Sequence, residues 1–189
     1  TGSSDNGISL EAANDNFLYG NDLRFNTGGV QVSGSLRNRI EANILSDITG
    51  NGLELGDGAL ENVIIGNFAN NNDADGISVE GSAPPGEGNL IEGNFTSGNA
   101  SDGIAVNGAG HIILGNEATG NSGWGIYASG PSTEGFNIDG GYNIGQGNAE
   151  PDRGTQRGRA PGSAPAQPAQ PEASRRRQDE DDSGEDSRG

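Results

Sequence analysis

Three acidic side chains near the middle of the chain have the residue type and spacing of a metal site. Asp73, Asp75 and Asp102 carry carboxylates, and Asp75 and Asp102 each precede a Gly-Ile pair in two matching stretches. Two carboxylates held close together repel each other unless a cation bridges them, and calcium takes oxygen ligands. The pattern predicts a candidate calcium site. The alternative interpretation is a set of solvated acids at a turn.

Two aromatic side chains form a second candidate site. Phe68 and Phe95 each follow a Gly-Asn dipeptide, so they occupy matching positions. We expect the two rings to stack and to point outward, because each ring follows a turn residue. An exposed pair of rings can lie under sugar rings, which makes Phe68 and Phe95 the candidate carbohydrate-binding residues. The alternative is that two neighbouring rings pack on each other without a ligand.

Groups that could transfer protons are scarce. The single His, His111, stands where Asn62 and Asn89 stand in neighbouring stretches, so we interpret it as a substitution at a turn. Every basic residue is Arg, and only three of them precede residue 149. General acid–base catalysis needs a positioned group that titrates near the working pH. The sequence therefore favours a chain without catalytic residues, although it leaves an enzyme open.

The composition narrows the class of partner. The chain has 189 residues, a net charge of -17, and neither Cys nor Met. So acidic a surface repels phosphate backbones, and nucleic acid is not an expected partner. Without Cys, disulfides and thiolate sites are excluded. No apolar run approaches the roughly 20 residues of a membrane-spanning helix, so we expect no membrane span.

A repeat positions all of these residues. A Gly that opens a pair of alternating apolar residues recurs every 22 to 27 residues, at Gly7, Gly29, Gly52, Gly76, Gly103 and Gly125. A period of two places both members of a pair on one face of a strand. A second short apolar segment follows each pair, centred on Leu18, Ile40, Ile64, Ile91, Ile113 and Ile138.

Asn residues recur after the second apolar segment. One column comprises Asn21, Asn43, Asn67, Asn94 and Asn116, and a second column five residues later comprises Asn26, Asn72, Asn99 and Asn121. Ile48 interrupts the second column. Asn tolerates left-handed backbone and can hydrogen-bond to an Asn stacked on it. We therefore expect the columns to be structural corners.

If each repeat is one turn of a coil, each strand lies about 4.8 Å from its counterpart in the next turn. The sequence thus predicts an all-β, parallel β-helix of about six coils over residues 1–148. From residue 149 to 189, Pro, Ala, Gln, Arg and acidic residues replace the pattern. We expect a disordered, low-complexity tail there.

The units of the form Asn-x-Ile-x-Gly-Asn followed by Asp-Gly-Ile-x-Val resemble right-handed parallel β-helix repeats. The group in question is related to the NosD copper-processing proteins and to pectate-lyase-like folds. The stretch 136–143 is similar to the last coil of many secreted bacterial members. The resemblance covers roughly residues 5–148 and implies a right-handed β-helix at an extracellular or cell-surface location. It implies no particular activity, since many functions share this fold.

These observations favour a secreted or surface-exposed, non-catalytic module that binds polysaccharide or another cell-surface partner. One alternative is a fragment of a carbohydrate-active enzyme, of the lyase or epimerase type, that lacks its catalytic residues here. Another alternative is a purely structural spacer.

Overall fold

A computed structural model describes residues 5–129, 138–141, 144–146, 148 and 156–157. All of these residues belong to one compact unit, Thr1–Gly158. Their regular structure consists of strands, as expected of an all-β chain. In this part of the chain, no helix is long and apolar enough to cross a membrane.

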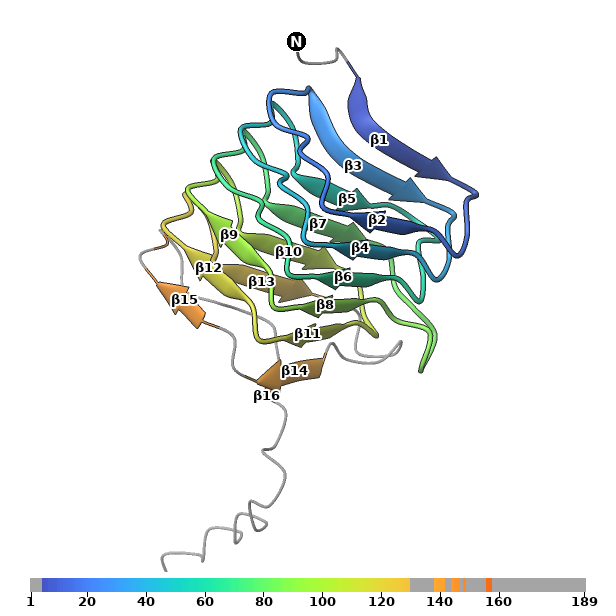
Figure 1. The fold of residues 1–189 in the computed structure, drawn as a ribbon. Coiled ribbons are helices and arrows are strands. Elements are labelled where there is room, and N and C mark those ends of the chain that lie inside the picture. Colours follow the sequence, from blue (N-terminus) through green and yellow to red (C-terminus); the bar gives the residue numbers. More distant parts are fainter. Residues whose placement is uncertain (1–4, 130–137, 142–143, 147, 149–155, 158–189) are drawn as a thin grey trace, which may run out of the picture. The chain divides into compact units, whose positions relative to one another are not determined.

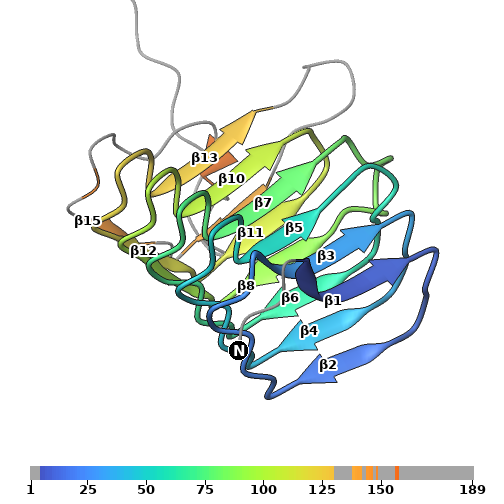
Figure 2. The ribbon, with the colours of Figure 1, turned by 90° about the horizontal axis from the view of Figure 1, so that it is seen from above.

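Two parallel sheets run the length of the unit (Figure 1). The six-stranded sheet has the order β1 (Asn6–Glu11), β3 (Gly28–Ser33), β5 (Leu53–Leu55), β7 (Ile77–Glu80), β10 (Ile104–Asn107) and β13 (Ile126–Ser129). The seven-stranded sheet has the order β16 (Gln156–Arg157), β14 (Ile138–Gly141), β11 (Ile112–Leu114), β8 (Leu90–Glu92), β6 (Val63–Ile65), β4 (Arg39–Glu41) and β2 (Phe17–Tyr19). Successive coils thus supply neighbouring strands, which Figure 2 shows from above.

A third sheet completes each coil. It contains β9 (Phe95–Ser97), β12 (Glu117–Thr119) and β15 (Ile144–Gln146). Isolated parallel bridges extend this sheet backward from Phe95 through Phe68 and Ile44 to Asp22. One turn therefore passes through all three sheets, and the predicted parallel β-helix of about six coils is confirmed.

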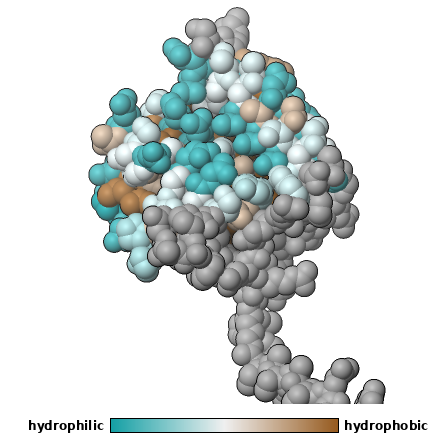
Figure 3. All heavy atoms as spheres, turned by 180° about the vertical axis from the view of Figure 1, so that it is seen from behind, coloured by the Kyte–Doolittle hydropathy of each residue, from teal (hydrophilic) through white to brown (hydrophobic). Residues whose placement is uncertain are grey.

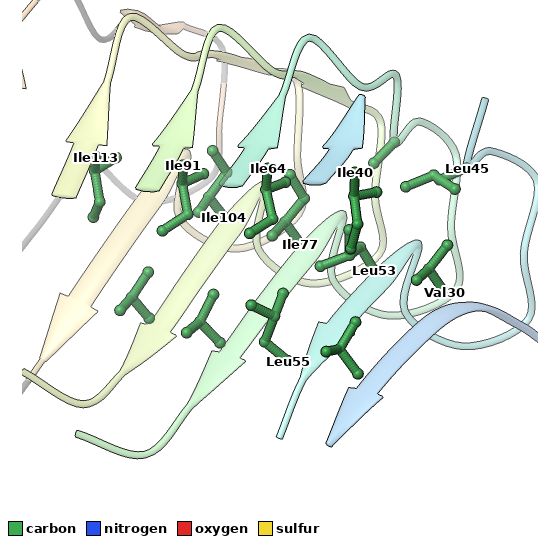
Figure 4. Close-up of a cluster of buried hydrophobic side chains, with 14 of the residues drawn as sticks. Val30, Ile40, Leu45, Leu53, Leu55, Ile64, Ile77, Ile91, Ile104 and Ile113 are labelled. Atoms are coloured by element: carbon green, nitrogen blue, oxygen red, sulfur yellow. The ribbon is translucent and has the colours of Figure 1, made fainter. Parts of the chain in front are cut away.

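The core is a stack of matching apolar side chains. Ile77 pairs with Ile104, and Ile64 pairs with Ile91, as the repeat predicts. All four side chains are fully buried. Figure 4 shows the columns that they form with their counterparts from neighbouring coils. Burial of a branched aliphatic side chain contributes about 1.5–3 kcal/mol, so repetition of one register stabilises the whole unit.

The corners depend on left-handed backbone. The position before the first Asn column has φ between 54° and 66° in five consecutive coils, where Gly20, Ala42, Gly66, Gly93 and Gly115 stand. Gly adopts this conformation without steric cost, which explains why four of the five are Gly.

The side of the molecule that faces away in Figure 1 is mostly hydrophilic (Figure 3).

The sixth coil departs from the expected register. The sequence predicts that Ile138 stacks on Ile113, but Ile138 pairs with Ile112 and Asp139 pairs with Ile113. The strands are thus already offset by one residue at Ile112, and a β-bulge between Ile113 and Leu114 adds a second offset, so that Leu114 pairs with Gly141.

Little of the expected tail can be compared with the structure. Within residues 149–189, the described residues are Gln156 and Arg157, which form β16 and pair with β14. Residues 149–155 and 158–189 lie outside the described part. The disordered tail therefore stays a prediction.

Candidate functional site

The first Asn column is a continuous hydrogen-bonded ladder. The Asn67 side-chain oxygen accepts hydrogen bonds from the backbone N–H and the side-chain amide of Asn43, at 3.0 and 2.9 Å. The Asn67 amide group donates to the Ile40 carbonyl at 2.9 Å and to the Asn94 oxygen at 3.0 Å. Both Asn67 and Asn94 are fully buried. Only Asn offers this acceptor and two donors on so short a side chain.

The second Asn column has the same geometry along part of its length. Asn72 donates its backbone N–H to Asn99, and Asn99 does the same to Asn121. The ladder ends on Asn148, which accepts two hydrogen bonds from Asn121. Ile48 occupies the equivalent position in its coil, where its backbone N–H still donates to Asn72.

A third ladder was not recognised in the sequence as a column. It runs through the residues that lie five positions before the first column, which are Asn16, Asn38, Asn62, Asn89 and His111. The signal was available, because three Asn at a spacing of five residues occur in three coils. The first five coils therefore have three corners each, and a ladder side chain occupies every corner except the one at Ile48.

His111 closes the third ladder in place of Asn. Its Nδ1 accepts the Asn89 backbone N–H at 3.2 Å, and its Nε2 lies 3.0 Å from the Gly81 carbonyl oxygen. A carbonyl can only accept and a backbone N–H can only donate, so these partners require the neutral tautomer with hydrogen on Nε2. Burial lowers the pKa of His111, and its hydrogen bond to Gly81 offsets only part of this effect. The histidine thus has a structural place, at 1% exposure.

Asp75 and Asp102 are brought together, as their matching positions predict. Asp75 accepts the Asp102 backbone N–H at 2.9 Å, and Asp102 accepts the Trp124 backbone N–H at 2.7 Å. The pKa of Asp102 is raised, chiefly because burial disfavours its charge, and the neighbouring Asp75 carboxylate adds to the effect. The Trp124 N–H acts in the opposite direction. These acids therefore hold successive coils together at a fourth position.

Asp73 does not join them in a group of ligands. It is exposed, and its backbone N–H donates to the Ile48 carbonyl. Across the described ranges, no three His, Cys, Asp or Glu side chains come together in a way that could hold a metal ion. Calcium at Asp73, Asp75 and Asp102 stays a prediction, and the hydrogen bonds of Asp75 and Asp102 favour a structural role.

One surface feature is a column of exposed apolar side chains on the third sheet. Ile44, Phe68 and Phe95 are paired in register on three consecutive coils. They are 36%, 45% and 42% exposed. The two rings stack with centroids 5.2 Å apart and an interplanar angle of 10°. We call these three residues the outer aromatic column.

Polar groups border this column on one side. An open groove beside Ile44 and Phe68 is also lined by Arg24, Ser46, Asp47, Asn70 and Asn71. Arg24 forms an ion pair with Asp22 at 2.6 Å and lies over the Phe25 ring. The hydrogen bond from Arg24 lowers the pKa of Asp22. The groove thus combines ring surface with amide, hydroxyl and charged groups.

This arrangement suits recognition better than catalysis. A sugar has apolar C–H faces and a rim of hydroxyl groups, and the groove offers matching groups to both. Phe68 and Phe95 cannot transfer protons, and the column is held in register by parallel bridges between successive coils. The structure brings the two predicted Phe residues together, and it adds Ile44 and the groove residues, which the sequence did not reveal.

Comparison with known proteins identifies the family. The sequence profile of the family described as Periplasmic copper-binding protein (NosD) matches residues 1–138. The matched range contains every strand from β1 to β13 and therefore most of the β-helix. No curated protein matches the chain. The chain belongs to the NosD family of right-handed β-helix proteins.

Proposed function

We propose that this chain is a non-catalytic β-helix module that binds polysaccharide along the outer aromatic column. The observation that carries the proposal is the in-register exposure of Ile44, Phe68 and Phe95 on successive coils. Aromatic side chains normally bury most of their surface. An exposed ring stack keeps apolar surface in contact with water, which is unfavourable unless a ligand covers it. A polymer with a repeating unit can contact such a column at several positions.

The polar groups of the groove support the same ligand. The Asn71 amide group can donate to and accept from hydroxyls, whereas the Asn70 oxygen already accepts two hydrogen bonds from Ser97, so Asn70 offers its amide N–H groups. Asp47 and Arg24 add a carboxylate and a guanidinium within the same groove. Ligand sites commonly pair an apolar surface with a few polar groups that fix orientation.

The histidine of the chain and the titratable groups of the groove support a binding role rather than an enzymatic one. His111 is enclosed in a corner ladder and held neutral. The groove itself offers Asp47 together with an Arg, and arginine stays protonated at working pH. Asp47 and Arg24 therefore do not supply the proton donor and proton acceptor that general acid–base catalysis needs.

The family description mentions copper binding, but the side chains of this chain do not fit a copper site. Copper in proteins prefers thiolate, thioether and imidazole ligands. The chain has no Cys and no Met, and its one His is 1% exposed with both ring nitrogens hydrogen-bonded. These residues therefore do not form a copper site of the usual kind. The family is periplasmic, and we propose that the chain acts outside the cytoplasm.

Affinity electrophoresis tests the proposal. The chain is run through gels that contain pectin, alginate or a neutral β-glucan, and retarded migration reports binding. We expect retardation in at least one gel. The Phe68→Ala and Phe95→Ala variants should bind at least about tenfold more weakly, since loss of ring contact costs on the order of 1.4 kcal/mol.

Tyr127→Ala is the control, because it removes an aromatic side chain from the six-stranded sheet and should leave the migration unchanged. Ultraviolet detection of unsaturated products, with pectin or alginate and added calcium, separates binding from lyase activity. Product formation would contradict the non-catalytic part of the proposal. Unretarded migration in all three gels would contradict polysaccharide binding and favour a structural spacer.

A further inference from the structure

The outer side of the seven-stranded sheet carries an apolar surface that lies apart from the outer aromatic column. In five consecutive strands the central residue is buried and its two neighbours face outward. In coil order these outward pairs are Phe17 and Tyr19, Arg39 and Glu41, Val63 and Ile65, Leu90 and Glu92, and Ile112 and Leu114. We call this set the outer face of the seven-stranded sheet.

The outer face is unusually apolar for a surface in contact with water. Phe17 and Tyr19 are each 61% exposed, with ring centroids 5.5 Å apart, and Ile112 is 37% exposed. Val63, Ile65 and Leu114 are partly exposed beside them. Arg39 and Glu41 divide the apolar pairs of this face, so a partner that covers the face must match both the apolar pairs and the charged pair.

The strand register arranges the outer face in two columns. One column comprises Phe17, Arg39, Val63, Leu90 and Ile112, and the other comprises Tyr19, Glu41, Ile65, Glu92 and Leu114. The two outward residues of one strand form a row. The second row consists of Arg39 and Glu41, whose charges have opposite signs and lie in different columns. Arg39 and Glu41 form an ion pair within the chain at 2.6 Å.

This arrangement is complementary to itself. Consider a second copy related by a two-fold axis that lies in the interface and runs parallel to the coil axis. Each row then faces the same row of the second copy, and the columns are exchanged. Arg39 faces Glu41 of the second copy, and Glu41 faces its Arg39, so the two-fold axis generates two ion pairs.

The apolar rows match in the same way. Phe17 faces Tyr19, Val63 faces Ile65, and Ile112 faces Leu114 of the second copy. The fourth row is the exception, because Leu90 faces Glu92. Two sheets that pack face to face in this manner lie about 10 Å apart with nearly aligned strands, which leaves room for the side chains of both.

The other face-to-face two-fold arrangement is disfavoured by charge. An axis parallel to the strands reverses the order of the coils, so that the second row faces the fourth. Glu41 would then face Glu92 of the second copy, and Arg39 would face Leu90. Like charges opposite one another are destabilising, whereas complementary charges fix the register of an interface.

We propose that a second copy of this chain covers the outer face of the seven-stranded sheet, with the coils of both copies in the same order. The proposal does not depend on polysaccharide binding, since the outer aromatic column belongs to the third sheet. The contact spans five strands, or roughly 20 Å along the coil axis. A surface of this size gives a weak, concentration-dependent dimer.

Sedimentation velocity over a range of protein concentrations tests the proposal. We expect a monomer–dimer equilibrium. Arg39→Glu places two acids opposite each other in both halves of the contact and should raise the dissociation constant by about tenfold or more. Glu41→Arg should do the same. The double variant Arg39→Glu with Glu41→Arg restores opposite signs and should recover the dissociation constant to within about threefold.

Arg37→Glu is the matched control. Arg37 is as exposed as Arg39 and pairs with Asp15 and Glu61 at a corner, away from the outer face, so its reversal should leave dimerisation unchanged. Far-ultraviolet circular dichroism confirms that each variant keeps its strands. A monomer at every concentration would overturn the proposal. A dimer whose dissociation constant is unchanged by Arg39→Glu would also overturn it. Such a dimer would associate through another surface, such as the ends of the β-helix, where the charge at residue 39 has no effect.

Discussion

At the residue scale, a buried amide supplies the hydrogen-bonding groups that a corner needs. Asn67 receives two hydrogen bonds from Asn43 on one side and gives one to Asn94 on the other. Its remaining donor binds the Ile40 carbonyl. Both polar atoms of the side chain are therefore paired, and each amide satisfies backbone groups that a sharp turn would otherwise leave unpaired.

Asn67→Asp should therefore destabilise the chain by on the order of 3 kcal/mol at neutral pH. The new carboxylate is buried, cannot donate, and faces the Asn94 oxygen and the Ile40 carbonyl. Urea unfolding measures the change in the free energy of unfolding. Asn14→Asp is the control, because Asn14 is exposed and its oxygen, which accepts the Leu36 N–H, is retained. Equal stabilities of the two variants would contradict the ladder.

His111 should make stability depend on pH. Its folded-state pKa lies below the ordinary value of about 6.5, so the unfolded chain binds a proton that the folded chain rejects. The contribution is intact above about pH 6.5 and is lost progressively as the pH falls toward the folded-state pKa. His111→Asn restores the ladder residue and should remove this part of the dependence. Unfolding at pH 8, 6.5 and 5.5 measures it, and parallel profiles for both proteins would argue against a lowered pKa of His111 in the folded chain.

At the element scale, the corners decide whether successive strands can stack. Four of the five residues before the first Asn column are Gly, and Ala42 holds the same left-handed conformation at φ 54°. A methyl group at Gly66 would meet no atom within 4 Å. Any cost of a side chain there thus comes from the backbone alone.

Gly66→Ala should cost about 1 kcal/mol, and Ala42→Gly should stabilise the chain by a similar amount. The paired variants share one structural position in neighbouring coils, so each serves as the control for the other. Thermal or urea unfolding gives both values. A stabilising Gly66→Ala would show that the left-handed assignment of this corner is incorrect.

The sequence predicted the elements whose residues repeat in kind. The pairing of Ile77 with Ile104 and the outward pair Phe68 and Phe95 both follow from identical residues at matched positions. The slip that pairs Ile138 with Ile112 could not be predicted, because residues 112 and 113 are both Ile and residue type does not distinguish the two registers. The groove was also hidden, since its lining joins residues from different coils whose exposure depends on packing.

At the scale of the whole molecule, repeated coils give long regular faces with different chemistry. The third sheet carries the outer aromatic column, and the outer face of the seven-stranded sheet carries the surface proposed to bind a second copy. The side that faces away in Figure 1 is mostly hydrophilic (Figure 3). In repeat proteins each unit contacts mainly its neighbours, so stability accumulates along the stack and each face is free to vary. Such a rod can present a binding surface while the corners maintain the fold.

Copper binding separates this chain from the description of its family. We expect no tight copper site, since the chain has no Cys or Met and its one His is enclosed. Competition of the chain with a chromophoric Cu(I) chelator measures this, and the expected result is an unchanged chelator spectrum at one equivalent. Stoichiometric removal of copper from the chelator would contradict the prediction, because it would require copper ligands other than thiolate, thioether and imidazole.

The most direct test of polysaccharide binding is a nuclear magnetic resonance titration of the chain with oligosaccharides of pectin, alginate and β-glucan. Binding along the outer aromatic column predicts that at least one of these ligands shifts the backbone amide signals around Ile44, Phe68 and Phe95, while signals of the six-stranded sheet stay in place. Shifts confined to another face, or no shifts with any of the three ligands while all signals indicate a folded chain, would contradict it.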